Sequence, residues 1–159
     1  MVKTGRGGRY LEDYREGEII VSVPYELSQR EIIEFAELYD PQPIHIDEAY
    51  AREGPFGNVI ASGFQTIAIA FRLFLKTGYF DDGVSMGGPG MDEVRWRVPI
   101  YPGDILTNFT TVLEARRSKS KADAGVLRLA HDLRNHKDES CTTGITVTMI
   151  RARTGVQVS

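Results

Sequence analysis

Asp40 and His45 stand five residues apart within the segment YDPQPIHID, residues 39–47. Two prolines lie between them, and because a proline ring fixes its own φ, the backbone that joins the two side chains is stiff. A carboxylate and an imidazole held at a fixed separation can orient and activate one water molecule by acid–base chemistry. The segment therefore predicts a catalytic pair formed by Asp40 and His45.

A structural interpretation of the same residues stays open. Asp40 can simply end the helix that precedes it, and His45 can be an ordinary half-buried histidine whose nitrogens are hydrogen-bonded. The spacing of two residues does not separate these interpretations.

A second candidate feature is Ser62-Gly63, at the start of a long apolar segment. The first N–H groups of a helix have no partner within the helix, and the helix dipole favours negative charge there. Such groups can polarise a carbonyl oxygen, and glycine lets a substrate approach the backbone closely. The alternative is a plain helix cap with Ser62 as the N-cap residue, and the two roles are compatible.

The elements that must position these residues are helices. Ser28 and Glu31 form a capping-box pattern, and the apolar residues that follow have helical spacing, which predicts a helix over residues 28–39 that ends before Pro41. Asp47 can cap a short helix over residues 47–52. Residues 62–77 are apolar nearly all round, so we expect a helix buried on most sides.

The other elements are strands. Residues 18–25 predict a first strand, and alternating or β-rich patterns follow at residues 94–98, 105–113, 127–133 and 145–149. Helices that cluster between a first strand and later strands indicate an α+β domain, in which a curved antiparallel sheet wraps one long apolar helix.

Length and composition bound the other possibilities. The 159 residues fit a single domain, 1–159, in which residues 1–17 are expected to form a partly flexible N-terminal arm. The net charge of −3 gives no basic field for nucleic acid. The apolar stretch over residues 60–75 is shorter than the roughly 20 residues that span a bilayer, so we expect no membrane partner. A single cysteine and the absence of a signal-like segment favour the cytoplasm.

Metal and phosphate sites are not expected. Of the three histidines, His45 has Asp47 two residues away, whereas His131 and His136 are five residues apart on or beside a strand, so their side chains tend to face opposite sides. The glycine-rich loop at residues 83–90 lacks a G-x-G-x-x-G match and is not followed by a helix, so we do not interpret it as a phosphate-binding loop.

Three segments together resemble a known family. The blocks YDPQPIHID at residues 39–47, IASGFQT and FRL within residues 60–73, and VPIYPGD at residues 98–104 are similar to the MaoC-like dehydratases and (R)-specific enoyl-CoA hydratases. The resemblance extends from about Tyr10 to the final strand. The Asp-x₄-His block is its specific part, whereas the Tyr-Pro-Gly-Asp turn alone would be weak.

The resemblance implies a hot-dog fold and a hydratase that adds water to an enoyl thioester of coenzyme A or an acyl carrier, or catalyses the reverse dehydration. It implies that Asp40 and His45 are catalytic, and that Gly63 supplies an oxyanion N–H with Ser62 beside it. Relatives often have Asn in place of Gln42 and Trp-His in place of Phe64-Gln65, so these three positions are expected to shape the substrate site. It further implies a homodimer or dimer of dimers, and no cofactor other than the coenzyme A of the substrate.

Two rival functions remain open. Thioesterases of this fold commonly carry a catalytic Asp or Glu on the central helix, and residues 62–80 contain neither, which favours hydration. A non-catalytic module that binds acyl thioesters is the other rival, and the intact Asp40 and His45 argue against it. The basic loop over residues 116–121 is expected to be a solvated hairpin turn, with contact to coenzyme A phosphates as the alternative.

Overall fold

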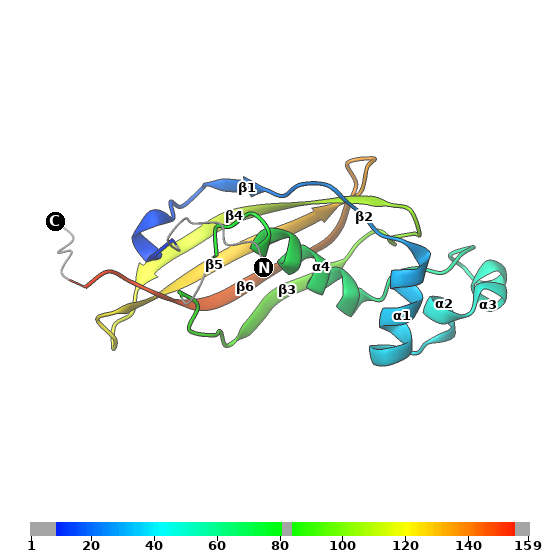
Figure 1. Ribbon diagram of the computed structural model, residues 1–159, viewed down its shortest axis with the longest axis horizontal. Coiled ribbons are helices and arrows are strands. Elements are labelled where there is room, and N and C mark those ends of the chain that lie inside the picture. Colours follow the sequence, from blue (N-terminus) through cyan, green and yellow to red (C-terminus); the bar gives the residue numbers. More distant parts are fainter. Residues whose placement is uncertain (1–8, 81–83, 155–159) are drawn as a thin grey trace.

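The computed structural model describes residues 9–80 and 84–154, and its strands form one antiparallel sheet (Figure 1). The sheet has the order β1-β4-β5-β6-β3, and β2 pairs with the start of β4. The helical elements are η1 (Leu11–Asp13), α1 (Gln29–Tyr39), α2 (Pro43–Ile46), α3 (Glu48–Glu53) and α4 (Gly63–Leu75). The strands are β1 (Ile19–Val21), β2 (Tyr25–Glu26), β3 (Gly90–Trp96), β4 (Ile105–Arg117), β5 (Ala124–Arg134) and β6 (Ser140–Arg151).

Helix α4 packs along one face of this sheet, while α1, α2 and α3 gather at one end of it (Figure 1). The side of α4 that is buried carries Ile69, Ala70, Leu73 and Phe74. Burial of this apolar face against the sheet is the main stabilising interaction that the helix makes. The expected α+β arrangement, with a long apolar helix held by an antiparallel sheet, is confirmed.

The predicted helix over residues 28–39 is confirmed as α1. The Ser28 hydroxyl accepts a hydrogen bond from the Glu31 N–H, and the Glu31 carboxylate accepts one from the Ser28 N–H at 3.0 Å, so the capping box is formed. The backbone N–H of Asp40 donates to the carbonyl oxygen of Ala36 as the last bond of the helix. Asp40 is thus the C-cap residue, and its side chain is free to point away from α1.

The segment that holds His45 contains a helical turn that the sequence analysis did not predict. Pro43 begins this turn, α2, and His45 lies within it. Proline is well suited to the first position of a helix, because its φ is already helical and the N–H it lacks would have no partner there. Asp47 then caps α3, and its carboxylate accepts the Tyr50 N–H at 3.0 Å.

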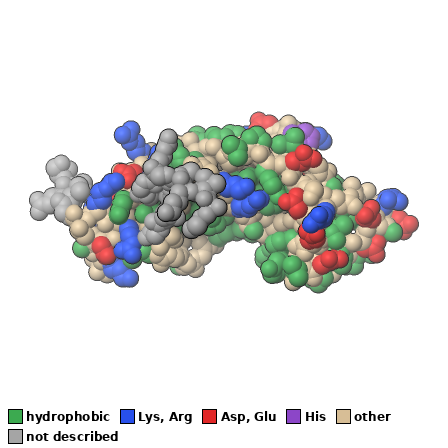
Figure 2. Space-filling view, in the orientation of Figure 1, with side chains coloured by type: hydrophobic (Ala, Val, Ile, Leu, Met, Phe, Trp, Pro, Cys, Tyr) green, Lys and Arg blue, Asp and Glu red, His purple; other side chains and the backbone are tan. Residues whose placement is uncertain are grey.

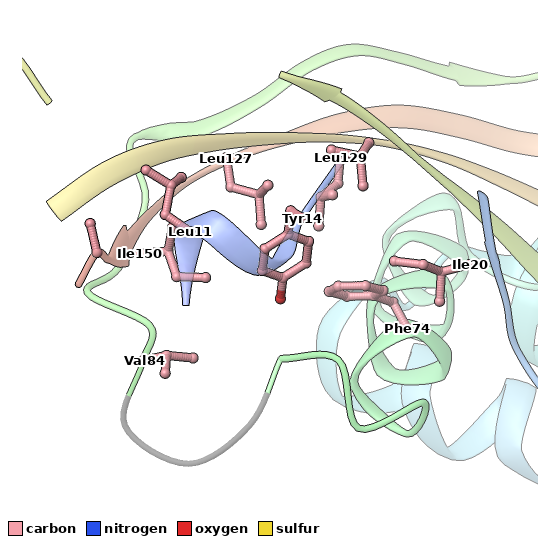
Figure 3. Packing of buried hydrophobic residues seen from close by; sticks show 10 residues of the cluster. Leu11, Tyr14, Ile20, Phe74, Val84, Leu127, Leu129 and Ile150 are labelled. Atoms are coloured by element: carbon pink, nitrogen blue, oxygen red, sulfur yellow. The ribbon is translucent and has the colours of Figure 1, made fainter. Parts of the chain in front are cut away.

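The amino-terminal residues that the structure describes pack onto the sheet instead of forming a loose arm. Leu11 and Tyr14 are buried, and they point into a cluster with Phe74 of α4 and Leu127 and Leu129 of β5 (Figure 3). The Tyr14 hydroxyl also donates to the carbonyl oxygen of Tyr79. Within the segment expected to be a partly flexible arm, residues 9–17 thus include buried apolar side chains, and residues 1–8 lie outside the described part of the chain.

Strand β3 contains a β-bulge. Asp92 pairs with Ile145 and Arg95 pairs with Thr143, so β3 has one more residue than β6 over this stretch. Glu93, inside the bulge, has a φ of 53°, in the left-handed region that non-glycine residues rarely adopt. Because the extra residue changes which side chains face the helix, the bulge determines where the end of β3 points.

The basic loop lies far from the cluster of helices. Residues 118–123 join β4 to β5 at the end of the sheet opposite α1, α2 and α3 (Figure 1). Beside the loop, Arg117 forms a salt bridge with Glu12 at 2.6 Å, which ties η1 to the sheet. The hairpin connection is confirmed. In the part of the chain that the structure describes, no helix has the length and apolar character needed to cross a membrane.

Candidate active site

A pocket of about 410 Å³ lies where α1, α2 and the start of α4 meet the end of β3. Its polar side is formed by Asp40, Gln42 and His45, and much of the rest is apolar. Ligand sites are commonly of this kind, with mostly apolar walls and a few polar groups that converge. Both members of the predicted catalytic pair lie in it, together with Gly63.

The carboxylate of Asp40 accepts hydrogen bonds from two side chains. Ser62 Oγ donates to Oδ2 at 2.6 Å, and Gln42 Nε2 donates to Oδ1 at 2.7 Å. These bonds, with a smaller contribution from the nearby His45, hold the pKa of Asp40 below its ordinary value of 3.8, although partial burial acts in the opposite direction. Asp40 is therefore an ionised and weakly basic carboxylate at neutral pH.

His45 is buried, with 4% of its surface exposed, and both ring nitrogens have a defined neighbour. Nδ1 lies 2.7 Å from the carbonyl oxygen of Ile60, and since a carbonyl only accepts, Nδ1 must carry a proton. Nε2 lies 3.3 Å from Oδ2 of Asp40. In the neutral ring Nε2 has a lone pair that faces the carboxylate, so a donor such as water is needed to satisfy both groups.

Gly63 is the first residue of α4, and Ser62 is its N-cap. The Ser62 hydroxyl accepts the Phe64 N–H at 3.2 Å while it donates to Asp40, so one side chain both caps the helix and holds the carboxylate. The N–H of a first helical residue has no acceptor within its helix. Gly63 lines the same pocket as Asp40 and His45, so the positive end of the α4 dipole lies at this pocket.

The other residues that the sequence indicated for substrate binding lie in different places. Gln42 and Phe64 line the pocket, and Phe64 is 62% exposed. Gln65 is not among the lining residues, because its side chain turns to α1 and Nε2 donates to the carbonyl oxygen of Glu31 at 2.9 Å. A substrate contact for Gln65 does not fit this position. Ser62 is fully buried and acts on Asp40 instead of lining the pocket.

Most of the other lining residues were not predicted from the sequence, among them three that come from the sheet and its end. Trp96 and Arg97 come from the end of β3 and the residue after it, and Thr142 comes from β6. The alternation of Val94, Trp96 and Val98 indicates that Trp96 faces the helix, but it does not tell which part of the helix it meets. Only the pairing of Trp96 with Thr142 fixes that position.

The second buried histidine, His131, belongs to the core. Its Nδ1 lies 3.1 Å from Nδ2 of Asn108, and its Nε2 lies 3.0 Å from Oγ1 of Thr146. Burial lowers the pKa of His131 to about 4, so the ring is neutral at pH 7. His131 is not among the residues that line the pocket, and the described residues contain no group of three His, Cys, Asp or Glu side chains that could hold a metal ion.

Known proteins share both the sequence pattern and the fold. The family model of the MaoC-like domain matches residues 15–132. The Bacillus subtilis protein YdeM is 31% identical over 128 residues, 80% of this chain and 89% of that protein. A 3-hydroxybutyryl-CoA dehydratase from Methylorubrum extorquens is 29% identical over 118 residues, 71% of this chain and 69% of that protein. The structure of a MaoC-like dehydratase from Rhodospirillum rubrum superposes with a TM-score of 0.81 at 34% identity, and the match covers 92% of this chain and 99% of that one.

The double role of Ser62 leads to a prediction. Ser62→Ala removes the helix cap and a donor to Asp40, so we expect a loss of roughly 1 kcal/mol or more in the free energy of unfolding, and a higher pKa for Asp40. A depressed carboxylate pKa stabilises the fold above the unfolded-state value, and this stabilisation is lost as the pH falls through the folded-state value. The destabilisation by Ser62→Ala should therefore shrink below about pH 4.

The measurements are urea unfolding at several pH values and an NMR titration of the Asp40 carboxyl carbon. Thr77→Ala is the matched control, because the Thr77 hydroxyl donates to the carbonyl oxygen of Phe74 at the other end of α4 and does not contact Asp40. An Asp40 pKa that is equal in Ser62→Ala and wild type would show that the hydroxyl does not control the carboxylate.

Proposed function

The chain belongs to the MaoC-like domain family and has the expected hot-dog fold, and from this premise we propose that it is an enoyl-thioester hydratase. It would add water to the double bond of an enoyl-CoA or an enoyl acyl-carrier thioester, or catalyse the reverse dehydration of the 3-hydroxyacyl thioester. The observation that carries the proposal is the Asp40–His45 pair, with Oδ2 and Nε2 3.3 Å apart in a pocket that also contains the N-terminus of α4.

In the first step, Asp40 and His45 activate a water molecule, and the hydrogen-bond partners of each side chain indicate its role. One water lies between Nε2 of His45 and the carboxylate of Asp40, where it can donate to both. The low pKa of Asp40 makes its carboxylate a weak base, so it orients the water and stabilises the imidazolium that forms. Nε2 takes a proton from the water as the water oxygen bonds to the β-carbon of the substrate. Ile60 keeps the proton on Nδ1 throughout, because its carbonyl oxygen needs a donor.

The second step places a proton on the α-carbon. Attack at the β-carbon shifts the electrons of the double bond toward the thioester oxygen, which becomes an enolate. The Gly63 N–H and the dipole of α4 stabilise this negative charge. The proton held on Nε2 then passes to the α-carbon, which restores neutral His45. Water is added with no net transfer of electrons, so coenzyme A is needed only as part of the substrate.

The first test replaces the two catalytic side chains. Asp40→Asn and His45→Gln should each lower the hydration rate of the best substrate by roughly two orders of magnitude or more, with the melting temperature largely kept. The assay follows the loss of absorbance of the conjugated thioester over a panel of enoyl-CoAs. His136→Gln is the matched control, because His136 is a half-exposed histidine that does not line the pocket.

Near wild-type turnover in both variants would remove Asp40 and His45 from the mechanism. Release of free thiol from saturated acyl-CoAs, faster than hydration of enoyl-CoAs, would instead place the protein among the thioesterases. Binding of acyl-CoA with neither reaction would identify a non-catalytic binding module.

A CoA substrate brings phosphates to an acidic region of the surface. Acidic side chains gather over the end of the molecule that α1, α2 and α3 form (Figure 2). Among the described residues that line the pocket, Arg97 is the only lysine or arginine, and it is exposed. We therefore propose that Arg97 binds a phosphate of coenzyme A, in preference to the basic loop at residues 116–121, which lies at the far end of the sheet.

Arg97→Ala should raise the KM for enoyl-CoA by about tenfold and change kcat little, since the phosphates do not take part in the chemistry. The enoyl-pantetheine thioester lacks those phosphates, so its KM should be the same in both proteins. Arg97→Lys should recover part of the affinity. An equal loss with enoyl-CoA and enoyl-pantetheine would mean that Arg97 acts on the pocket itself and not on the phosphates.

We also propose that the protein forms a homodimer or a dimer of dimers. Strand β3 lies at an edge of the described sheet, so one side of its backbone has no strand partner in the single chain. Trp96 and Phe64, at the mouth of the pocket, are 55% and 62% exposed. A second chain beside β3 would pair the edge and cover these apolar side chains.

Sedimentation equilibrium at micromolar concentration should give at least twice the chain mass of 17.8 kDa. Hydration activity per chain should fall when the protein is diluted below the dissociation constant of the dimer. A strict monomer with full turnover would contradict the idea that a neighbouring chain completes the pocket.

A further inference from the structure

The indole of Trp96 lies directly on the first residue of α4. A Cβ atom built on Gly63 would be 2.4 Å from Cε2, 2.6 Å from Nε1 and 2.8 Å from Cζ2 of Trp96. Carbon atoms in contact are normally about 3.5–4.0 Å apart. With the indole in this position there is no room for a side chain at residue 63, so a methyl group there would have to move the ring.

The bulge in β3 is what brings Trp96 to this face. Met91 pairs with Thr146 of β6 and Trp96 pairs with Thr142, and both partners are buried on the side of the sheet that faces α4. Met91 and Trp96 are an odd number of residues apart, so strict alternation would put them on opposite faces. The extra residue beside Glu93 restores Trp96 to the inner face. The unusual φ of 53° at Glu93 therefore lies in the bulge that sets the direction of the Trp96 side chain.

The indole is held loosely in the single chain. It is 55% exposed, and its aromatic contact is an edge-on approach to Phe64, with ring centroids 6.1 Å apart at 67°. Phe64 is itself 62% exposed, and no hydrogen bond of the indole N–H is found within the described residues.

We propose that Trp96 is a specificity-determining residue, whose indole limits the size of the acyl group that can lie against the N-terminus of α4. The inference rests on the proposed hydratase function and names its substrate class as short-chain enoyl thioesters. A thioester whose oxygen meets the Gly63 N–H must place its acyl group in the same pocket as the indole. A short chain can share that space with the ring, whereas a long chain must displace it.

The main experiment compares short and long substrates in Trp96 variants. In Trp96→Ala, the ratio of kcat/KM for decenoyl-CoA to kcat/KM for crotonyl-CoA should rise by about tenfold or more. Trp96→Phe should give an intermediate ratio. Tyr50→Ala is the matched control, because Tyr50 is an aromatic residue of like exposure, 56%, that does not line the pocket. Its ratio should equal that of the wild type.

A second experiment needs no turnover. Gly63→Ala should lower the melting temperature in the wild-type protein, because the new methyl group collides with the indole. In the Trp96→Ala protein the same substitution should be neutral or raise the melting temperature, since alanine favours a helix more than glycine does. An equal effect of Gly63→Ala in both backgrounds would overturn the contact on which the proposal depends.

The possible outcomes distinguish a failure of the hydratase function from a failure of the role of Trp96. If the wild type hydrates enoyl-CoAs and Trp96→Ala keeps the same ratio of long to short substrates, the role of Trp96 is wrong and the hydratase stands. If the wild type hydrates no enoyl-CoA, the proposed function fails, and the substrate role of Trp96 fails with it, whatever the melting temperatures show. A higher ratio in Trp96→Ala, with the expected melting temperatures, supports both.

Discussion

The hydrogen bond from Ser62 to Asp40 joins the end of α1 to the start of α4 and places a charge inside the pocket. Burial raises the pKa of a carboxylate, because it disfavours the ionised form. Ser62 and Gln42 supply two donors, so Asp40 stays ionised with 12% of its side chain exposed. The same Ser62 hydroxyl accepts the Phe64 N–H, so the cap of α4 cannot be altered without altering the carboxylate.

His45 depends on a different set of contacts, and these come from backbone. The carbonyl oxygen of Ile60 accepts from Nδ1, and the N–H of Ile60 donates to the carbonyl oxygen of Ile44 at 3.2 Å. Both backbone polar groups of Ile60, in the segment that leads into α4, are thereby hydrogen-bonded to residues of α2. The imidazole can then present only Nε2 to the pocket. Asp40 is therefore held by hydrogen bonds from side chains, and His45 is held by a hydrogen bond to backbone.

Local signals in the sequence predicted the helices well. The Ser28–Glu31 capping box and the apolar spacing gave residues 28–39, and α1 is Gln29–Tyr39; the apolar run gave residues 62–77, and α4 is Gly63–Leu75. Both signals act within a few residues of the helix they specify. Strands β4, β5 and β6 extend beyond the predicted residues 105–113, 127–133 and 145–149, because ladder hydrogen bonds hold residues that lack an alternating pattern. The first strand was predicted too long, since residues 18–25 contain only the short strand β1 and the first residue of β2.

The candidate site was predictable only in part, because its remaining contacts join distant segments. Asp40, His45 and Gly63 were indicated by residue type and by the family resemblance, and all three line one pocket. Gln65 was adjacent to them in sequence, but on a helix neighbouring residues point about 100° apart, and Gln65 turns to α1 instead. Trp96 is the opposite case, since it is distant in sequence and close in space.

Trp96 lines the pocket, and its position depends on the bulge in β3. The bulge costs an unfavourable backbone conformation at Glu93, of the order of 1–3 kcal/mol for a non-glycine residue. Without it the indole would face the outer side of the sheet, and the first turn of α4 would be open toward β3. With it, a Cβ at residue 63 would lie 2.4 Å from the ring, so glycine is the residue that fits without moving the indole. The glycine at the N-terminus of α4 and the unfavourable φ at Glu93 in the edge strand lie 30 residues apart in the chain, and both are linked to the position of the Trp96 indole.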